Sequence, residues 1–295
     1  MKLIKRENIE DSKWNACISK SPNGLIYGLT WFMDCLVDKW SGLVWEKDNE
    51  YEAVFPIPFK TKFGIKYVYP PFFIQQLGMF SPYDKGEKEA ITYLKKNFKF
   101  VELNLNYFAT IGEERKNLLL SLNKDYESIK AKYSSNHKRN LLKSNKSGLV
   151  INNADVSDVI SLFRMDKGAK LSILKDRDYI RFYNLVKEAG KQSCLLVKGV
   201  FKDEKLICGG VFMKFKNRII FIFSGNSLEG RKDAALFFLL DHIIQQYSKS
   251  GFNLDFEGSQ DEGLARFYKG FGAKEESYRF YKHNNLPAIL KKIKR

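Results

Sequence analysis

The sequence predicts an α+β fold built from two similar domains. The first observation is a repeated order of elements, because residues 12–106 and 155–257 each suggest two helices, three or four strands, a long helix and a strand. A period of this length is typical of a duplicated domain rather than of a solenoid. The second is that antiparallel strands followed by a strand–helix–strand unit give a mixed sheet flanked by helices. The third is length, since 295 residues exceed the usual size of one hydrophobic core.

Turn signals and hydrophobic periodicity define the elements of the first half. Apolar spacing predicts a short helix near Trp14, and Thr30 is typical of the residue that caps a second helix. Strands are expected at 43–45, 52–59, 65–69 and 73–80. The tripeptide Lys62-Phe63-Gly64 is the expected hairpin tip between two of them. A helix at 87–98 and a strand at 100–105 complete this half.

The second half opens with a long basic helix, expected to run from Tyr126 to Gly148. Further helices are expected at 156–167, 176–189 and 232–248. Strands are expected at 193–201, 205–215, 218–224 and 252–257. The order of these elements matches that of the first half, which is the basis of the predicted duplication.

Composition indicates a globular protein with a polyanionic partner. The chain is 44% hydrophobic and 15% aromatic, and its net charge is +16. Such a charge favours RNA, a nucleotide-linked substrate, coenzyme A or an anionic membrane surface, with ordinary solubility charge as the alternative. No apolar run reaches membrane-spanning length, so we expect no stable membrane insertion.

Cysteine usage and the first residues predict a cytoplasmic protein. The four cysteines form no C-x-x-C pair, and MKLIKRENIEDSKW lacks the apolar core of a signal peptide. Reduced, buried thiols are therefore expected. The three histidines are widely separated, so neither a metal site nor a histidine-based triad is expected.

The strongest functional signal lies between Gly251 and Ala273, GFNLDFEGSQDEGLARFYKGFGA. Its first part alternates apolar and polar residues as a half-buried strand does. Asp255 and Glu257 are two residues apart, so we expect them to share the face opposite Leu254 and Phe256. Such carboxylates are candidates for a general base or for orienting an amine. A solvated sheet face or a salt bridge to Arg or Lys is the alternative.

Two motifs carry a resemblance to a known family. LDFEGS followed by GLARFYKGFGA resembles the final motif of the GNAT superfamily, and more closely that of its FemAB-like, peptidoglycan aminoacyltransferase-like branch. SSNHKRNLLKSNKSG resembles the signature that opens the second domain of Fem-like proteins. The resemblance implies two tandem GNAT-like domains in a compact, FemX-like form, because the family's long helical arm is absent. The expected domains are 1–120, joined by the returning segment 284–295, and 121–283.

The resemblance also implies catalytic roles for two neighbouring residues. Tyr268 matches the tyrosine that GNAT enzymes place near the thioester sulfur as a proton donor. Lys269 stands where Fem proteins carry a basic residue lining the acyl-donor site, and an ammonium there would stabilise a tetrahedral oxyanion. A buried core tyrosine and an ordinary surface lysine are the alternatives.

Substrate-binding candidates come from both halves. Arg139 is the best phosphate clamp, because its guanidinium is planar, forked and always charged, and Lys138 and Asn140 lie beside it. A solvated helix face is the alternative there. Gln75 and Gln76 stand among aromatic residues, where side-chain amides can bind sugars or peptide groups or can merely satisfy a sheet edge.

The donor is expected at the strand–loop–helix FIFSGNSLEGRKDAALFFLL, where a GNAT enzyme would hold the pyrophosphate of coenzyme A. The donor-binding candidates are Ser224, Asn226, Arg231 and Lys232. The superfamily's Q/R-x-x-G-x-G/A pattern is absent. This departure weakens the acyl-CoA assignment and is what Fem-like proteins, which use aminoacyl-tRNA, would show.

The sequence therefore predicts an acyltransferase or aminoacyltransferase. It would move an acyl or aminoacyl group from an acyl-CoA or an aminoacyl-tRNA to an amine of a phosphate-bearing or cell-envelope-type acceptor bound between the domains. No tightly bound cofactor is expected, and tRNA is a candidate partner. The alternatives are an acyl-CoA-dependent N-acetyltransferase and a non-catalytic nucleotide- or RNA-binding module with the same fold.

Overall fold

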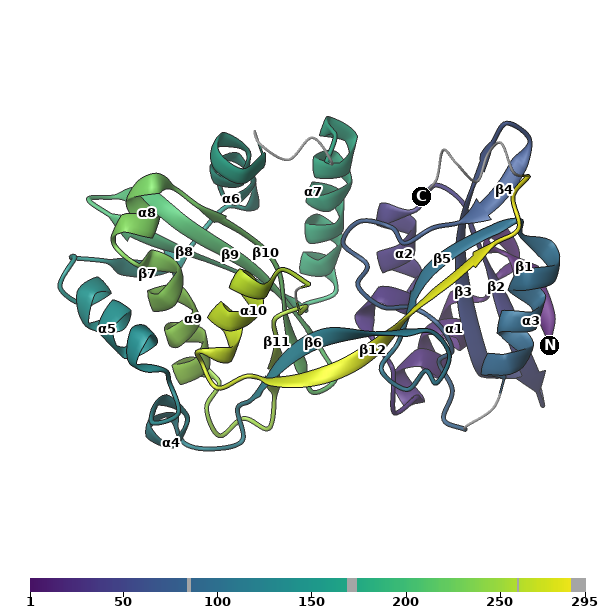
Figure 1. Cartoon of the computed structure of the whole chain (residues 1–295), viewed down its shortest axis with the longest axis horizontal. Helices are drawn as coiled ribbons and strands as arrows, with labels where there is room; N and C mark the ends of the chain where they lie inside the picture. Colours follow the sequence, from purple (N-terminus) through teal and green to yellow (C-terminus); the bar gives the residue numbers. More distant parts are fainter. Residues whose placement is uncertain (84–85, 169–173, 259, 288–295) are drawn as a thin grey trace. The chain divides into compact units, whose positions relative to one another are not determined.

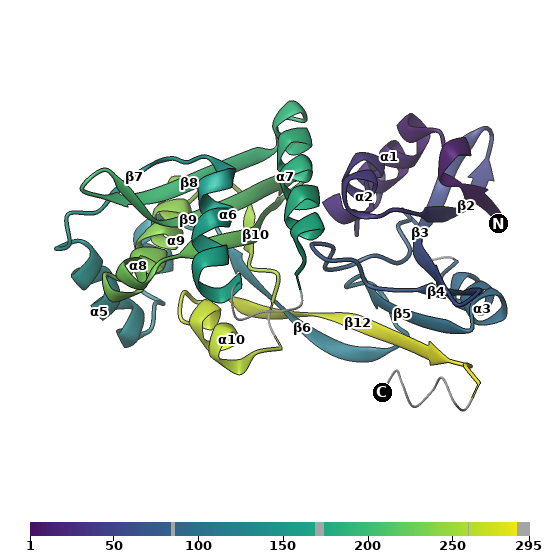
Figure 2. The ribbon, with the colours of Figure 1, turned by 90° about the horizontal axis from the view of Figure 1, so that it is seen from above.

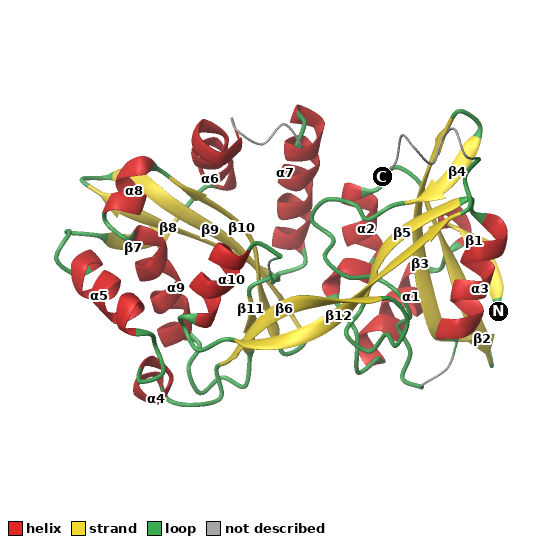
Figure 3. Ribbon diagram, in the orientation of Figure 1, coloured by secondary structure: helices red, strands yellow, loops and turns green. Residues whose placement is uncertain are grey.

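The computed structural model describes residues 1–83, 86–168, 174–258 and 260–287 (Figure 1). The chain divides into two compact units. Unit 1 comprises Met1–Arg115 and Ser277–Arg295, and unit 2 comprises Lys116–Glu276. Each is a mixed, mostly antiparallel sheet flanked by helices (Figure 3), which confirms the predicted α+β class.

Unit 1 contains the strands β1 (Lys2–Lys5), β2 (Trp40–Lys47), β3 (Glu50–Lys62), β4 (Ile65–Val68), β5 (Phe100–Leu105) and most of β12 (Lys274–Asn284). Its helices are α1 (Asp11–Lys20), α2 (Thr30–Leu36), α3 (Glu87–Asn97) and the short 3-10 turns Arg6–Asn8 and Ile26–Gly28. The strand order is β1-β2-β3-β4-β5-β12. Among the strand pairs described for unit 1, β4 and β5 run parallel and the others antiparallel.

Unit 2 contains the strands β6 (Glu113–Ser121, in large part), β7 (Val150–Asn153), β8 (Leu195–Lys202), β9 (Lys205–Phe215), β10 (Arg218–Asn226) and β11 (Asn253–Asp255). Its helices are α4 (Tyr126–Lys130), α5 (Ser135–Ser144), α6 (Val156–Phe163), a π-turn (Arg164–Gly168), α7 (Asp176–Lys191), α8 (Leu228–Lys232), α9 (Ala235–Gln246) and α10 (Glu262–Lys269). The strand order is β6-β11-β10-β9-β8-β7. In the described part of unit 2, β10 and β11 run parallel and the other strand pairs antiparallel.

The two units repeat one connectivity. Each has an outer strand, two helices, three antiparallel strands, a helix and then a strand parallel to the third. In each unit the last of these strands then pairs with an antiparallel strand from a distant part of the chain. β6 follows β5 in sequence but pairs with β11, whereas β12 follows α10 but pairs with β5. This repeat matches the predicted tandem organisation.

Helices cover both faces of the unit 2 sheet. Successive strand residues face opposite sides, and a Cβ on Gly209 would touch Val159 of α6, whereas one on Gly210 would touch Leu239 of α9. α6 and α9 therefore pack on opposite faces of β9 (Figure 2). The core around α9 and α10 is largely aliphatic and aromatic, with fully buried members including Leu118, Phe212, Ile219, Leu240, Ile243, Leu254 and Phe271.

Helix predictions fail where a capping residue interrupts the periodicity. The basic stretch forms α4 and α5 rather than one helix, because the Ser134 side chain accepts a hydrogen bond from the His137 backbone N–H and starts a new helix. The stretch 232–248 is broken at Ala234, whose φ is 58°. Thr30 is the first helical residue of α2, so its prediction as the N-cap is wrong by one position.

Strand predictions succeed where turn residues bound the strand. The strand at 100–105 matches β5, and Phe63-Gly64 turns between β3 and β4 as predicted. The strand expected at 73–80 is wrong, because that segment is a loop with single bridges at Leu77 and Phe80. Gln75 and Gln76 thus lie in a loop. Residues 288–295 of the returning segment lie outside the described residues, whereas β12 joins unit 1 up to Asn284.

Candidate active site

The candidate site of unit 2 lies where β10 and β11 part. The parallel pairing begins at Arg218 opposite Asn253 and ends at Ile220 opposite Asp255. β11 stops there, whereas β10 continues to Asn226 with a bulge between Phe221 and Phe223. A bulge adds twist to a strand, so it turns the second half of β10 away from the line of β11.

Tyr268 lies across this parting. α10 begins after Asp261, whose Oδ1 accepts a hydrogen bond from the Leu264 N–H at 2.8 Å, and the helix carries Tyr268 on its buried face. The Tyr268 ring stacks on Phe256, with centroids 4.5 Å apart, and meets Phe221 edge-on at 6.5 Å. Phe256 directly follows β11 and Phe221 directly follows the paired part of β10, so the phenol spans both strand ends.

The phenol of Tyr268 is held in its protonated form. The side chain is 7% exposed. Burial raises the pKa of Tyr268, and the nearby negative charge of Glu257 raises it further. A phenol of this kind stays neutral near pH 7 and can donate a hydrogen bond or a proton. Two predicted catalytic residues, Tyr268 and Glu257, thus belong to the same region of unit 2, because Glu257 directly follows Phe256, on which the Tyr268 ring stacks.

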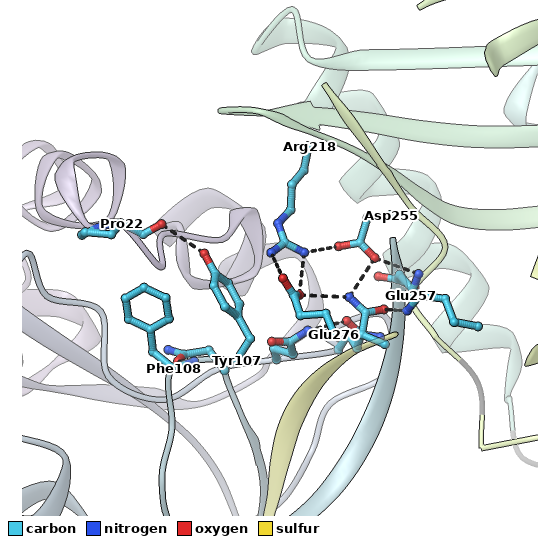
Figure 4. Close-up of polar contacts among 12 residues, drawn as sticks. Pro22, Tyr107, Phe108, Arg218, Asp255, Glu257 and Glu276 are labelled. Carbon is cyan, nitrogen blue, oxygen red and sulfur yellow. Dashed lines mark hydrogen bonds and ion pairs between the residues drawn. The ribbon is translucent and has the colours of Figure 1, made fainter. Parts of the chain in front are cut away.

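Asp255 forms the salt bridge that the sequence left as the alternative (Figure 4). It is 1% exposed, and it accepts hydrogen bonds from Arg218 Nη1 at 2.8 Å and from Asn117 Nδ2 at 3.1 Å. A third comes from the Glu257 backbone N–H at 2.9 Å. The expected shared face is wrong, because β11 ends at Asp255 and Glu257 has a left-handed backbone with φ of 53°. A Cβ on Gly258 would overlap the Lys116 carbonyl, so the chain there packs tightly on β6.

Arg218 joins two carboxylates in the interior. Its Nη1 lies 2.8 Å from Asp255 and 3.0 Å from Glu276, and its Nη2 donates to Glu276 at 2.8 Å. Burial alone would lower the pKa of Arg218, but Asp255 and Glu276 raise it. With Asn117, the network takes one residue from each of the adjacent strands β12, β6, β11 and β10. The sequence analysis missed Arg218, although a charge at the start of the apolar run RIIFIF was a usable signal.

Lys269 faces a pocket on another side of α10. The pocket has a volume of about 650 Å³ and is lined by Ser134, Asn136, His137, Gly263, Arg266, Phe267, Lys269 and Gly270. Lys269 Nζ forms an ion pair with Glu275 at 2.5 Å. Successive helical residues project about 100° apart, so Lys269 and Tyr268 point to different surroundings. The structure thus separates two residues that the family resemblance placed in one step.

His137 joins the two sequence motifs. It is 2% exposed, and its Nε2 lies 2.8 Å from the Phe267 carbonyl oxygen, while Nδ1 lies 2.9 Å from Ser134 Oγ. Because a carbonyl only accepts, Nε2 carries the proton and Nδ1 accepts from the serine hydroxyl. A Cβ on Gly270 would overlap the His137 ring, so this contact requires glycine. From the sequence, His137 was considered only for a metal site or a histidine-based triad, neither of which was expected, so this role was missed.

The predicted substrate residues lie in different units. Lys138 and Arg139 are exposed on α5, where Lys138 Nζ donates to the Ala131 carbonyl at 3.0 Å and Arg139 Nη2 to Asn136 Oδ1 at 3.0 Å. Asn140 Nδ2 donates to the Asn136 carbonyl at 2.9 Å. In unit 1, Gln76 is 1% exposed, and its Nε2 lies 2.8 Å from the Oε1 of Gln75.

The predicted donor residues gather at the end of β10. Ser224 is partly exposed on the strand, and Lys232 is exposed at the end of α8. Arg231 Nη1 donates to the Asn226 carbonyl at 3.2 Å. Asn226 Oδ1 is buried and accepts no hydrogen bond from the described residues. The loop thus presents cations beside a buried acceptor.

Two searches of the described residues gave no candidates. No group of three or more His, Cys, Asp or Glu residues in the described ranges is placed to hold a metal ion. Among the helices of the same ranges, none is long and apolar enough to cross a membrane.

Comparison with known proteins identifies the fold. No family model matches the sequence, and no curated protein matches it. FemX superposes over 100% of both chains with a TM-score of 0.70 at 12% identity. The chain has a tandem GNAT-like fold, which it shares with FemX. A tandem GNAT protein from the clavulanic acid biosynthesis pathway matches over 97% of this chain and 99% of its own, with a TM-score of 0.58 at 8% identity. L-PGS from Bacillus licheniformis matches over 96% and 95%, with a TM-score of 0.51 at 10% identity.

The burial of His137 predicts an acid-sensitive stability. Burial lowers the pKa of His137 below its ordinary value, so the unfolded chain takes up the proton first as the pH falls. The free energy of unfolding should therefore decline below about pH 6.5, with a slope of at most about 1.4 kcal/mol per pH unit for each such histidine. Urea unfolding between pH 7.5 and 5.5 measures it. His137→Gln should reduce the slope, and an unchanged slope would contradict the assignment.

Proposed function

We propose that the chain is a transferase that moves an acyl or aminoacyl group from an activated donor to an amine. The observation that carries the proposal is the buried Tyr268 phenol, which stacks on Phe256 and meets Phe221 at the parting of β10 and β11, with Glu257 directly after Phe256 in the chain. Tyr268 and Glu257 stand in a chain whose fold matches that of FemX over its full length. Acyl transfer to an amine uses one group that accepts a proton from the amine and one that donates a proton to the leaving atom. A carboxylate and a protonated phenol can fill these two roles.

The proton balance of the reaction assigns a role to each residue. The amine attacks the donor carbonyl, a C–N bond forms, and Glu257 accepts the proton that the nitrogen loses. The tetrahedral intermediate then collapses, the bond to the leaving oxygen or sulfur breaks, and Tyr268 donates its proton to that atom. The phenolate recovers a proton from Glu257, so one proton passes from the amine to the leaving group and both residues return to their initial state.

Asp255 serves as a positioning residue in this mechanism. Arg218, Asn117 and the Glu257 backbone already donate to its carboxylate, and it is 1% exposed. Because these three donors already occupy both of its oxygens, Asp255 is not placed to accept a proton from a substrate amine. Its hydrogen bond to Glu257 holds the left-handed turn that carries the catalytic carboxylate.

The exposed cations of unit 2 supply binding. Lys138 and Arg139 project from α5, and Arg266 and Lys269 line the pocket beside its first turn. A phosphate-bearing substrate suits this arrangement, because Arg and Lys make charge-assisted hydrogen bonds to phosphate oxygens. Lys269 belongs with binding in this proposal, since it faces the pocket rather than the Tyr268 phenol.

Aminoacyl-tRNA is the donor that the loop after β10 favours. The Gly230 N–H, which would have to meet a pyrophosphate, already donates to Ser227 Oγ at 3.0 Å. A Cβ on Gly230 would overlap Asn226, so the turn is closely packed. Glu229 also adds negative charge there, although Lys205 lies 3.5 Å from it. These features disfavour the phosphates of coenzyme A at this loop.

The donor preference is tested by titration calorimetry. Acetyl-CoA should bind with a Kd on the order of 1 mM or weaker, equivalent to at most about 4 kcal/mol. Total aminoacyl-tRNA should bind more tightly, and deacylated tRNA is the control for the contribution of the nucleic acid alone. A micromolar Kd for acetyl-CoA would make an acyl-CoA-dependent N-acetyltransferase the leading assignment.

Tyr268→Phe separates chemistry from packing. The ring and its stacking on Phe256 remain, so the melting temperature should barely change, while kcat should fall about 100-fold or more if the phenol transfers a proton. Label transfer from aminoacyl-tRNA to an amine acceptor measures kcat. Tyr133→Phe is the control. The Tyr133 hydroxyl donates a hydrogen bond to Asp241 at a distance of 3.0 Å, and it does not lie at the parting of the strands. This variant should lose roughly 1.5 to 3 kcal/mol of stability and keep turnover. Full turnover in Tyr268→Phe would remove Tyr268 from the mechanism.

Arg139→Ala tests the phosphate clamp. Arg139 should hold a phosphate equally in the ground and transition states, so KM should rise about tenfold to a hundredfold with little change in kcat. The matched control is Lys143→Ala, an exposed cation on the same helix, which should leave both constants unchanged. Equal effects in the two variants would show that only the net charge of α5 matters.

A further inference from the structure

The tip of the β3–β4 hairpin exposes a large aromatic side chain. Phe63 is 83% exposed, and the turn that it forms with Gly64 closes a ladder in which Lys62 pairs with Ile65. The hairpin projects at the top of unit 1 in Figure 1, beside the label of β4. Phe63 is therefore presented to solvent at the end of a rigid, hydrogen-bonded element.

Folding alone does not explain a phenylalanine at this position. Phe63 has a φ of 51° and Gly64 of 74°, which is the left-handed pair that favours Asn-Gly in a two-residue turn. The other hairpin of unit 1 turns on Asp48 and Asn49, residue types that tolerate positive φ. A bulky ring in this conformation is strained, and at 83% exposure it gains little packing in return. A use outside the fold would explain it.

The charged side chains next to the tip in the sequence are all basic, and aromatic side chains lie beside them. Lys60, Lys62 and Lys66 lie within a few residues of the turn, and Lys62 Nζ lies 5.4 Å from the Phe63 ring centroid. Lys60 Nζ lies 4.0 Å from the ring of Tyr69. The sequence contains no Asp or Glu between Glu52 and Asp84. This stretch of sequence therefore contributes positive charge and no negative charge.

We propose that this tip docks reversibly on the surface of an anionic lipid bilayer. Phe63 enters the boundary between headgroups and acyl chains, and Lys60, Lys62 and Lys66 meet lipid phosphates, with their methylene stems lying along the apolar layer. A convex tip favours this surface over RNA, because single-stranded nucleic acid binds along basic grooves with aromatic stacking platforms. The inference is independent of the proposed catalytic activity.

Co-sedimentation of the full chain with vesicles tests the proposal. The protein should bind phosphatidylcholine vesicles that contain about 30% phosphatidylglycerol and should not bind pure phosphatidylcholine. Binding should weaken strongly between about 0.1 M and 1 M salt, because the Debye length shortens from about 10 Å to 3 Å.

Two variants divide the apolar from the electrostatic contribution. Phe63→Asn should weaken vesicle binding about tenfold or more, while the melting temperature stays the same or rises, because Asn-Gly suits the turn. The triple variant Lys60→Gln, Lys62→Gln, Lys66→Gln should weaken it about 100-fold. A control with the same loss of net charge changes three exposed lysines of unit 2 and should stay within about threefold: Lys143→Gln, Lys146→Gln, Lys187→Gln.

Three results would overturn the proposal. Unchanged vesicle binding in Phe63→Asn would show that the ring does not enter the bilayer. Equal losses in the two triple variants would show that only net charge attracts the protein to vesicles. Affinity for total tRNA that falls in Phe63→Asn while vesicle binding persists would assign the tip to nucleic acid. The retained melting temperature of Phe63→Asn excludes unfolding as the cause of any loss.

Discussion

The buried ion network around Arg218 fixes the geometry of unit 2. A guanidinium removed from water is costly, and here two carboxylates offset that cost through three hydrogen bonds. Removing one partner from such a network typically costs about 3–5 kcal/mol, because the other charge is left buried and unpaired. Since its members come from four adjacent strands, the network clamps β10 and β11 together at one end. It thereby determines where the two strands begin to part.

The positions of Glu257 and Tyr268 depend indirectly on the ion network around Arg218. Asp255 uses one oxygen for Arg218 and another for Asn117 and the Glu257 backbone, so the ion pair and the left-handed turn share one carboxylate. The turn places the Glu257 charge near the Tyr268 phenol. On the far side of α10, His137 fastens the helix to α5 through the Phe267 carbonyl. Tyr268 and the basic helix α5 are therefore held in place by contacts within the fold.

Local patterns in the sequence predicted the repeat and supplied several residues of the candidate site. Alternation and turn residues were sufficient for β5 and the β3–β4 hairpin, and the FYKGFG motif located Tyr268. The same patterns gave wrong element boundaries where a side chain forms a hydrogen bond with the backbone. Ser134 starts a new helix inside a basic stretch whose periodicity continues, and Asp255 turns the chain where alternation predicts more strand. Arg218 escaped notice because its partners lie 37 and 58 residues away, beyond any local pattern.

The exchange of β6 and β12 bears on how the chain reaches its native state. Val101 of β5 pairs with His283, so the edge of the first sheet is covered only by residues near the far end of the sequence. During synthesis, β5 emerges long before β12. The edge of β5 that pairs with β12 therefore presents unpaired N–H and C=O groups for most of translation. Pairing between strands this far apart in the sequence is also slow, because the chain loses the entropy of closing a long loop before the hydrogen bonds between the strands form. The topology of this fold therefore leaves one edge of β5 unpaired until β12 has been synthesised.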